Sequence, residues 1–236
     1  MVFKNEIKAV ISYLILFLTG LVFWVFIKVG NRTIIIGREN VPWRKNCLII
    51  ANHLTMVDSW FLTFAVYWPE VMVRPSLFPW HLPEERNFMK QHCLLTLLCD
   101  LSKCIPINRG SGDFIGKLDL LVDKLQNGSM MIFPEGGRSR QPKSGQLNTW
   151  RRGAAVLACE AQGVVLPVAI RGVEDILPIG KKFPRLFKHV AIVIGQPIEI
   201  KDLLTDNKEE SVKIISNRLR VDLQATLEMA FKQLEK

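Results

Sequence analysis

Short apolar runs alternate along this chain with longer segments in which apolar residues recur every three or four positions. Runs of four to seven residues rich in Val, Ile, Leu and Met predict buried strands. The predicted strands are residues 33–36, 47–50, 104–108, 130–133, 164–170 and 190–194. The longer segments predict helices at residues 59–68, 84–103, 113–127, 149–162 and 212–234. Strands that alternate with helices are typical of an α/β fold, here with a mixed, partly parallel sheet that helices cover on both faces.

The first apolar stretch is longer than any of these strands. Residues 7–29 are almost wholly apolar, and about 20 such residues are enough to cross the hydrocarbon core of a bilayer as a helix. No small-residue cleavage site follows, which argues against a signal peptide. The pair Thr19-Gly20 leaves open a segment that breaks and dips into one leaflet only. We therefore expect a hydrophobic helical membrane anchor at residues 1–30 and a folded domain at residues 31–236.

A proline-rich segment separates the first two predicted helices. Residues 74–83 contain three prolines, which exclude a regular helix, together with Phe78 and Trp80. Aromatic side chains on a loop beside a membrane anchor are typical of the headgroup level of a bilayer. The sequence therefore predicts that Phe78 and Trp80 are exposed and contact lipid.

The composition indicates which kind of partner the chain binds. The chain has 236 residues, of which 49% are hydrophobic, so it is long enough to bury a substantial core. Its 31 basic and 22 acidic residues give a net charge of +9, which favours an anionic partner. The basic residues are dispersed and no nucleic-acid-binding motif is present, so we expect no nucleic-acid partner. An anionic membrane surface or a phosphorylated substrate fits better.

The cysteines and histidines do not form a metal-binding pattern. The five cysteines are odd in number, lie in apolar surroundings and include no Cys-x-x-Cys pair, which is typical of free thiols in a reducing compartment. His92 and Cys93, followed by Cys99 and Cys104, do not have the spacing of a zinc site, so no metal is expected. The free thiols and the basic soluble part place the folded domain on the cytoplasmic face of a membrane, the inner membrane if the source is bacterial.

A histidine and an aspartate follow the second predicted strand. His53 lies on the turn from this strand into a helix, and Asp58 lies five residues later. Five residues correspond to about 140° around an ideal helix, so the two side chains would not meet if both were helical. With His53 just ahead of the first helical turn, the carboxylate of Asp58 reaches the imidazole. A carboxylate that fixes the tautomer of a histidine is the arrangement that a general base needs.

The sequence FPEGGRS at residues 133–139 follows another buried strand. It brings a carboxylate, two glycines and a guanidinium group to one turn: Glu135, Gly136, Gly137 and Arg138. Glycine lets the backbone approach a ligand closely, and arginine offers a planar fork of donors suited to phosphate. A solvated surface turn is the alternative interpretation.

These motifs together resemble those of the glycerolipid acyltransferases. Asn52-His53, four residues and Asp58 resemble the family's NHxxxxD signature, and residues 133–139 resemble its FPEGTRS block, with Gly137 in place of the usual Thr. Residues 105–109, which end in Arg109, and residues 165–170 resemble two further blocks in the expected order. The resemblance spans residues 48–171 and is closest in pattern to the 1-acyl-sn-glycerol-3-phosphate (lysophosphatidic acid) acyltransferases.

The resemblance implies a function, a fold and a set of site residues. It implies a glycerol-3-phosphate acyltransferase-like fold and an acyltransferase domain at residues 31–236. The implied reaction transfers an acyl group from acyl-coenzyme A or acyl carrier protein to a lysophospholipid acceptor at a bilayer, without a cofactor. His53 would act as the general base with Asp58 as its catalytic partner. Arg109 and Arg138 would bind the acceptor phosphate, and Glu135 and Gly136 would shape the acceptor site.

Three other functions remain open at this point. The chain could acylate a different lysophospholipid, or it could be a transacylase that takes its acyl group from a phospholipid. It could also be a membrane-anchored lipid-binding module without activity. The acceptor, the acyl-chain length and the donor are not encoded in these motifs.

Overall fold

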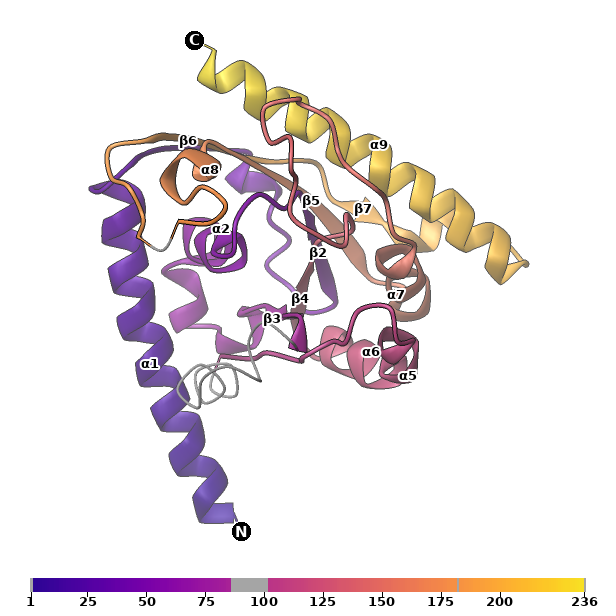
Figure 1. Ribbon diagram of the computed structural model, residues 1–236. Coiled ribbons are helices and arrows are strands. Elements are labelled where there is room, and N and C mark those ends of the chain that lie inside the picture. The colour runs from indigo at the N-terminus through magenta and orange to yellow at the C-terminus, as the bar shows by residue number, and fades with distance from the viewer. Residues whose placement is uncertain (1, 86–101, 182, 236) are drawn as a thin grey trace.

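The computed structural model describes residues 2–85, 102–181 and 183–235, and shows one mixed sheet between two layers of helices (Figure 1). The strands are β1 (Arg32–Ile36), β2 (Cys47–Ala51), β3 (Trp80–His81), β4 (Ser129–Ile132), β5 (Val164–Arg171), β6 (His189–Ile194) and β7 (Ile198–Glu199). Their order is β1-β6-β5-β2-β4-β3, with β7 paired to β5. β3, β4, β2 and β5 are parallel, whereas β6 and β7 run antiparallel to β5. The predicted mixed, partly parallel sheet is confirmed.

Helices cover both faces of this sheet, as predicted. The longer ones are α1 (Val2–Lys28), α2 (Asp58–Tyr67), α6 (Leu118–Gln126), α7 (Gly153–Ala161) and α9 (Lys208–Leu234), and two short ones are α5 (Asp113–Gly116) and α8 (Val173–Ile176). Alternate residues of β2 point to opposite faces, because side chains alternate along a strand. Ile49 packs in a core with α1 and α2, while Ile50 packs in a second core with α6, α7 and α9.

Short 3-10 turns lie at the surface and in the connections. They are η1 (Arg38–Asn40), η2 (Glu70–Met72), η3 (Pro75–Leu77) and η4 (Ile200–Leu203). Most of the predicted helix at residues 84–103, with Cys93 and Cys99, lies outside the described residues. The predicted strand at residues 104–108 runs beside the end of β3, through parallel bridges from His81 to Cys104 and from Glu84 to Ile107.

Two predicted helices differ in extent from those observed. The helix expected at 113–127 is divided at Lys117, whose amine binds the Asp113 carboxylate and the Pro106 carbonyl. The helix expected from residue 149 begins at Gly153. Before it, Trp150 donates from its indole nitrogen to Ser216 on α9. In each case the helix boundary lies beside a contact with another segment, which is Pro106 for Lys117 and α9 for Trp150.

Helix α1 packs along α2 by one face only. Leu16 and Ile27 are buried in the core that the sheet shares with α2, and Gly20 lies against the rings of Phe64 and Trp68. The window Val10–Lys28 is long and apolar enough to cross a membrane, and only 17% of it is buried inside the protein. The part of the chain that the structure describes thus carries one helix of membrane-spanning length and composition, and the outer face of this helix is apolar and exposed.

The structure corrects one expectation for residues 74–83. Phe78 is buried, not exposed: its ring packs edge-on against Phe64 of α2 at 5.9 Å. Trp80 is half-buried and forms part of β3. This segment therefore closes the core beside α2, and the prediction that Phe78 contacts lipid is wrong.

Candidate active site

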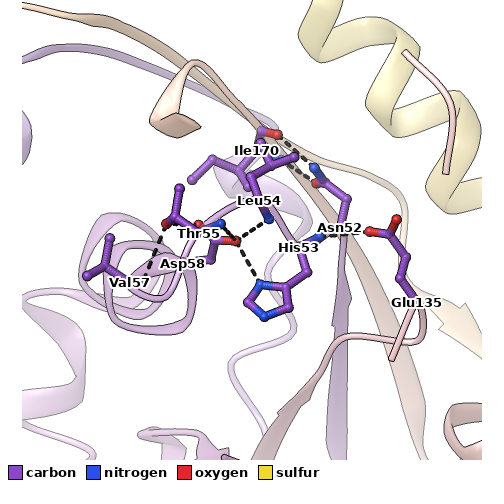
Figure 2. A network of polar contacts seen from close by, with 8 residues as sticks. All are labelled: Asn52, His53, Leu54, Thr55, Val57, Asp58, Glu135 and Ile170. Carbon is purple, nitrogen blue, oxygen red and sulfur yellow. Dashed lines mark hydrogen bonds and ion pairs between the residues drawn. The ribbon is translucent and has the colours of Figure 1, made fainter. Parts of the chain in front are cut away.

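His53 and Asp58 meet at the carboxyl end of β2, where the chain turns into α2 (Figure 2). The Nδ1 atom of His53 lies 2.9 Å from Oδ2 of Asp58. Asp58 is the first residue of α2 and His53 precedes the helix, which is the bend that brings residues five apart together. Because Nδ1 faces the carboxylate, it carries the proton, and Nε2 is left to accept one.

The carboxylate of Asp58 is fully buried and is held by its own turn. Oδ2 also accepts hydrogen bonds from the backbone amides of Leu54 at 2.5 Å and Thr55 at 2.8 Å. Oδ1 accepts from the Thr55 hydroxyl at 2.5 Å. A buried carboxylate needs such donors, because an ion without partners is costly in a low-dielectric interior. The imidazole is therefore held in one orientation.

Asn52 and Glu135 hold the backbone that carries the imidazole (Figure 2). The Asn52 side chain exchanges two hydrogen bonds with the backbone of Ile170 on β5, at 2.8 and 2.9 Å. One oxygen of the buried Glu135 carboxylate accepts from the His53 amide at 2.8 Å, and the other accepts from the Asn148 amide at 2.8 Å. These contacts are between distant parts of the chain and position His53 through its backbone.

The pKa of Glu135 reflects this buried position. Burial raises the pKa of its carboxyl above the ordinary value, while the amides of Asn148 and His53 oppose the increase by donating to the charged form. The sequence analysis assigned Glu135 to acceptor binding. The structure places its carboxylate on two backbone amides, so its observed contacts are those of a positioning residue.

A cleft of about 630 Å³ opens in front of His53. Its lining includes His53, with Arg109 and Arg138. The turns after β2 and β4 supply His53 and Arg138, and Arg109 follows residues 104–108, which run parallel beside the end of β3. Parallel strands place their carboxyl ends at one edge of the sheet, which brings these residues together. The side chain of His53 is 14% exposed, and its ring stacks on Phe133 at 4.3 Å between centroids. The imidazole and the two predicted guanidinium groups thus line one cleft.

The two arginines differ in how firmly they are held. Arg109 donates from Nη1 to the Gly136 carbonyl at 2.8 Å and lies 3.4 Å from the Glu84 carboxylate. Arg138 is exposed and forms no ion pair within the described part of the chain. Arg109 is therefore fixed in place, whereas the Arg138 guanidinium is free to bind an anion.

The glycines of the turn after β4 allow the backbone conformation of that turn. Gly136 has a φ of +69°, a left-handed conformation that favours glycine, and its amide donates to the Phe133 carbonyl at 3.1 Å. Its amide is thus used within the turn, and its carbonyl binds Arg109. Gly137 lines the cleft, and a Cβ atom added there would meet nothing within 4 Å.

Sequence reasoning missed three other residues that line the cleft. Arg140 is exposed there and adds a third guanidinium group. Trp60 of α2 stacks on His81, which is the last residue of β3, at 6.0 Å between ring centroids. The run RSR at residues 138–140 could have indicated that Arg140 lies in the site, because it places Arg140 two residues after Arg138. The sequence has no comparable signal for Trp60 or His81, because both read as parts of apolar segments.

The ring of His81 is buried. Neither of its ring nitrogens has a hydrogen-bond partner among the described residues. Burial, with a smaller effect from the charge of Lys103, lowers the pKa of His81 to about 4. The ring is therefore neutral at neutral pH and packs as an aromatic side chain between Trp60 and Phe78.

This lowered pKa predicts a loss of stability in acid. Between about pH 6.5 and pH 4 the unfolded chain binds a proton at His81 that the folded protein does not, so stability falls as the pH falls. The full effect is about 3 kcal/mol. His81→Phe keeps the ring packing. We expect its melting temperature in detergent to fall less than that of wild type when the pH is lowered from 7.5 to 5. His189→Phe, at an exposed histidine, should follow wild type, and equal losses in all three proteins would contradict the prediction.

A second cavity of about 420 Å³ adjoins the cleft. Both are lined by Leu82, Arg109 and Phe133. Most of the other side chains around the second cavity are apolar, among them Ile107 and Phe114. The site therefore combines a polar cleft, which contains the imidazole and the arginines, with an apolar cavity beside it.

Comparison with known proteins identifies a family to which the sequence of this chain is similar. A family model described as Acyltransferase matches residues 32–171, which contain His53, Asp58, Arg109, Glu135 and Arg138. The chain is 25% identical over 159 residues to N-acylphosphatidylethanolamine synthase of Arabidopsis thaliana, covering 64% of this chain and 55% of the relative. It is 25% identical over 196 residues to a chloroplastic 1-acyl-sn-glycerol-3-phosphate acyltransferase of Brassica napus, covering 78% and 52%. The chain spans about half the length of these relatives.

The fold has a counterpart among solved structures. The crystal structure of the 1-acyl-sn-glycerophosphate acyltransferase PlsC from Thermotoga maritima superimposes with a TM-score of 0.67. The match covers 96% of this chain and 88% of that one, at 18% sequence identity. At this identity the likeness establishes the fold alone, including the helix-covered mixed sheet and its N-terminal helix.

Proposed function

The chain belongs to the acyltransferase family, and on that premise we propose that it transfers an acyl group from a thioester to the free hydroxyl of a lysophospholipid. The acceptor that we propose is 1-acyl-sn-glycerol-3-phosphate, which gives phosphatidic acid. One observation carries the proposal: the imidazole that Asp58 orients lines the same cleft as Arg109 and Arg138. A base and an anion site in one cleft suit an acceptor that carries a hydroxyl close to a phosphate.

The proposed reaction needs no covalent enzyme intermediate. Nε2 of His53 takes the proton of the acceptor hydroxyl while that oxygen forms a bond to the thioester carbonyl carbon. The negative charge passes to the carbonyl oxygen, and the buried carboxylate of Asp58 stabilises the imidazolium. When the carbonyl re-forms, the carbon–sulfur bond breaks and the thiol leaves with the proton held by His53. The donor is acyl-coenzyme A or acyl carrier protein, and no cofactor takes part.

The two cavities suit the two ends of the substrates. Arg138, with Arg109 and Arg140, supplies donors for a phosphate at the polar cleft. The adjoining apolar cavity suits an acyl chain. The exposed apolar face of α1 suits association with the bilayer in which such lipids reside. We place the acyltransferase domain of residues 31–236 on the cytoplasmic face of that membrane.

Replacing Arg138 separates acceptor binding from chemistry. We expect Arg138→Gln to raise KM for 1-acyl-sn-glycerol-3-phosphate about tenfold, because a charge-assisted hydrogen bond contributes about 1.5–3 kcal/mol and exposure reduces this. Transfer to 1-acylglycerol, which has no phosphate, should not change. Arg138→Lys should recover part of the loss, and Arg220→Gln on the exposed surface of α9 is the matched control. An equal loss with both acceptors would contradict the phosphate-binding role.

A second candidate acceptor is a lysophospholipid with a larger headgroup. Gly137 stands where the family usually has Thr, and the space beside it is open. A wider cleft at this point suits a headgroup beyond the phosphate, and one relative is named as a synthase of N-acylphosphatidylethanolamine. A transacylase that takes its acyl group from a phospholipid is the corresponding alternative for the donor.

One assay distinguishes these functions. Labelled acyl-coenzyme A is offered with a panel of lysophospholipids that share an acyl chain and differ in headgroup, and labelled phospholipid replaces the thioester in a parallel set. The proposal predicts the highest kcat/KM with 1-acyl-sn-glycerol-3-phosphate and the thioester. Transfer to none of the acceptors would contradict acyltransferase activity.

A further inference from the structure

The segment between α8 and β6 exposes large apolar side chains beside basic ones. Phe183 is 83% exposed and Phe187 is 79% exposed. Ile179 and Leu186 are also exposed, so we call the described residues 179–181 and 183–188 the apolar–basic loop. Single exposed apolar residues are common in soluble proteins, but several on one short loop are typical of an interaction surface.

The charge of the apolar–basic loop is entirely positive. Lys181 and Arg185 are exposed, and Lys188 is half-buried. The sequence contains no acidic residue between Asp175 and Glu199. Phenylalanines interleaved with lysine and arginine match the chemistry of an anionic bilayer surface, which offers hydrocarbon below a layer of negative headgroups.

The apolar–basic loop is joined to the carboxyl end of α1. The Phe187 amide donates to the Gly30 carbonyl at 2.7 Å, and the Arg32 amide donates to the Lys188 carbonyl at 2.9 Å. Figure 1 shows this segment, in orange, beside the carboxyl end of α1, which is the end away from the N label. Val29 is 69% exposed at this end of the helix, so the apolar surface of the loop continues that of α1.

Basic residues continue across the same junction. Lys28 is the last residue of α1 and Arg32 is the first residue of β1, and both are exposed. The end of α1 and the loop therefore present apolar side chains and cations together. The positive charges of lysine and arginine attract an anionic membrane, and a phenylalanine ring that leaves water adds the burial of apolar surface.

The apolar–basic loop also reaches the catalytic cleft. Ile179, at its beginning, lines the cleft that contains His53 and Arg138. The loop thus extends from the cleft to the end of the helix of membrane-spanning composition. A lipid that left the bilayer along this loop would arrive at the imidazole.

We propose that the apolar–basic loop docks on an anionic lipid surface, with Phe183 and Phe187 inserted among the headgroups and Lys181 and Arg185 bound to their phosphates. This contact is separate from α1 and holds the mouth of the cleft against the bilayer. The inference that this contact helps to supply the acceptor rests on the proposed function. The inference that the loop contacts lipid does not.

Photo-cross-linking tests the contact directly. The full chain carries p-benzoylphenylalanine in place of Phe183, Phe187 or Val221, and is reconstituted in vesicles of phosphatidylcholine with 30 mol% phosphatidylglycerol. Val221 is the matched control, because it is apolar and exposed on α9. We expect cross-links to lipid acyl chains at positions 183 and 187, at least tenfold above those at 221. Yields equal to that at 221, or cross-links to a second copy of the chain in place of lipid, would overturn the proposal.

Activity then tests the use of the contact. In Phe183→Ser/Phe187→Ser and in Lys181→Glu/Arg185→Glu, we expect transfer to an acceptor embedded in the same vesicles to fall about tenfold. Transfer to the acceptor in nonionic detergent micelles should equal that of wild type, because neither pair of residues lines the cleft. Equal rates for wild type and variants in vesicles would overturn the inference that the loop supplies the acceptor. Absence of transfer by wild type in both media would instead contradict the proposed function and leave the cross-linking result standing.

Discussion

The variant His53→Ala is expected to transfer acyl groups about 10⁴-fold more slowly than wild type. The reason is that a neutral hydroxyl attacks a thioester carbonyl slowly unless its proton leaves as the new bond forms. His53 is the only histidine whose ring both faces a buried carboxylate and lines the cleft within the described part of the chain. The loss should fall on kcat, because Arg109 and Arg138 still bind the acceptor. Initial rates with labelled acyl-coenzyme A at saturating acceptor measure it.

Two controls separate this loss from misfolding. His189→Ala removes an exposed histidine from β6 and should retain the wild-type rate. The melting temperature of His53→Ala should stay within a few degrees of wild type, because the Asp58 carboxylate keeps its hydrogen bonds from the Leu54 and Thr55 amides and the Thr55 hydroxyl. Near-normal turnover in His53→Ala would contradict the assignment of the base.

Asp58→Asn is expected to lower kcat about 10³-fold with little change in KM. The amide can accept through only one oxygen, whereas the carboxylate binds the His53 ring, two backbone amides and the Thr55 hydroxyl. The NH₂ group would favour the tautomer of His53 that has its proton on Nε2, where the acceptor proton must go. The negative charge that stabilises the imidazolium would also be lost.

For Asp58→Asn, both the rate of acyl transfer and the integrity of the fold are measured. Asp123→Asn, on the exposed surface of α6, is the matched control and should retain the wild-type rate. Circular dichroism and melting temperature report any loss of the turn. If Asp58→Asn folds and turns over at the wild-type rate, the orientation of His53 by Asp58 does not contribute to catalysis.

Much of the sheet could be predicted from the sequence because its central strands are buried on both faces. β2, β4 and β5 read as continuous apolar runs, and their bounds agree with the predictions within about one residue. The antiparallel direction of β6 against β5 could not be read in this way, because an apolar run has no direction. The chain order of strands and helices therefore predicted the fold class but not the full topology.

The closeness of His53 and Asp58 could be predicted because the contact is local. Five residues and one bend into a helix determine it. Glu135 was assigned to acceptor binding from its motif, whereas its observed contacts are with amides 82 and 13 residues away. Long-range hydrogen bonds of this kind leave no periodic signal in a sequence.

The exposure of aromatic residues was the least predictable feature. Phe78 lies in a proline-rich segment and is nevertheless buried, because it packs against Phe64 and His81. Phe183 and Phe187 lie on either side of Pro184 and are exposed. A proline near an aromatic residue therefore does not indicate whether the ring is buried, because tertiary packing decides which rings reach the surface.

Chemical rescue tests the central claim most directly. His53→Gly leaves space beside Asp58, and added imidazole supplies a base that the same carboxylate can orient. The account predicts that imidazole restores acyl transfer to His53→Gly in a saturable manner, and that it restores nothing to His53→Gly/Asp58→Asn. Transfer by His53→Gly at nearly the wild-type rate without imidazole would contradict it.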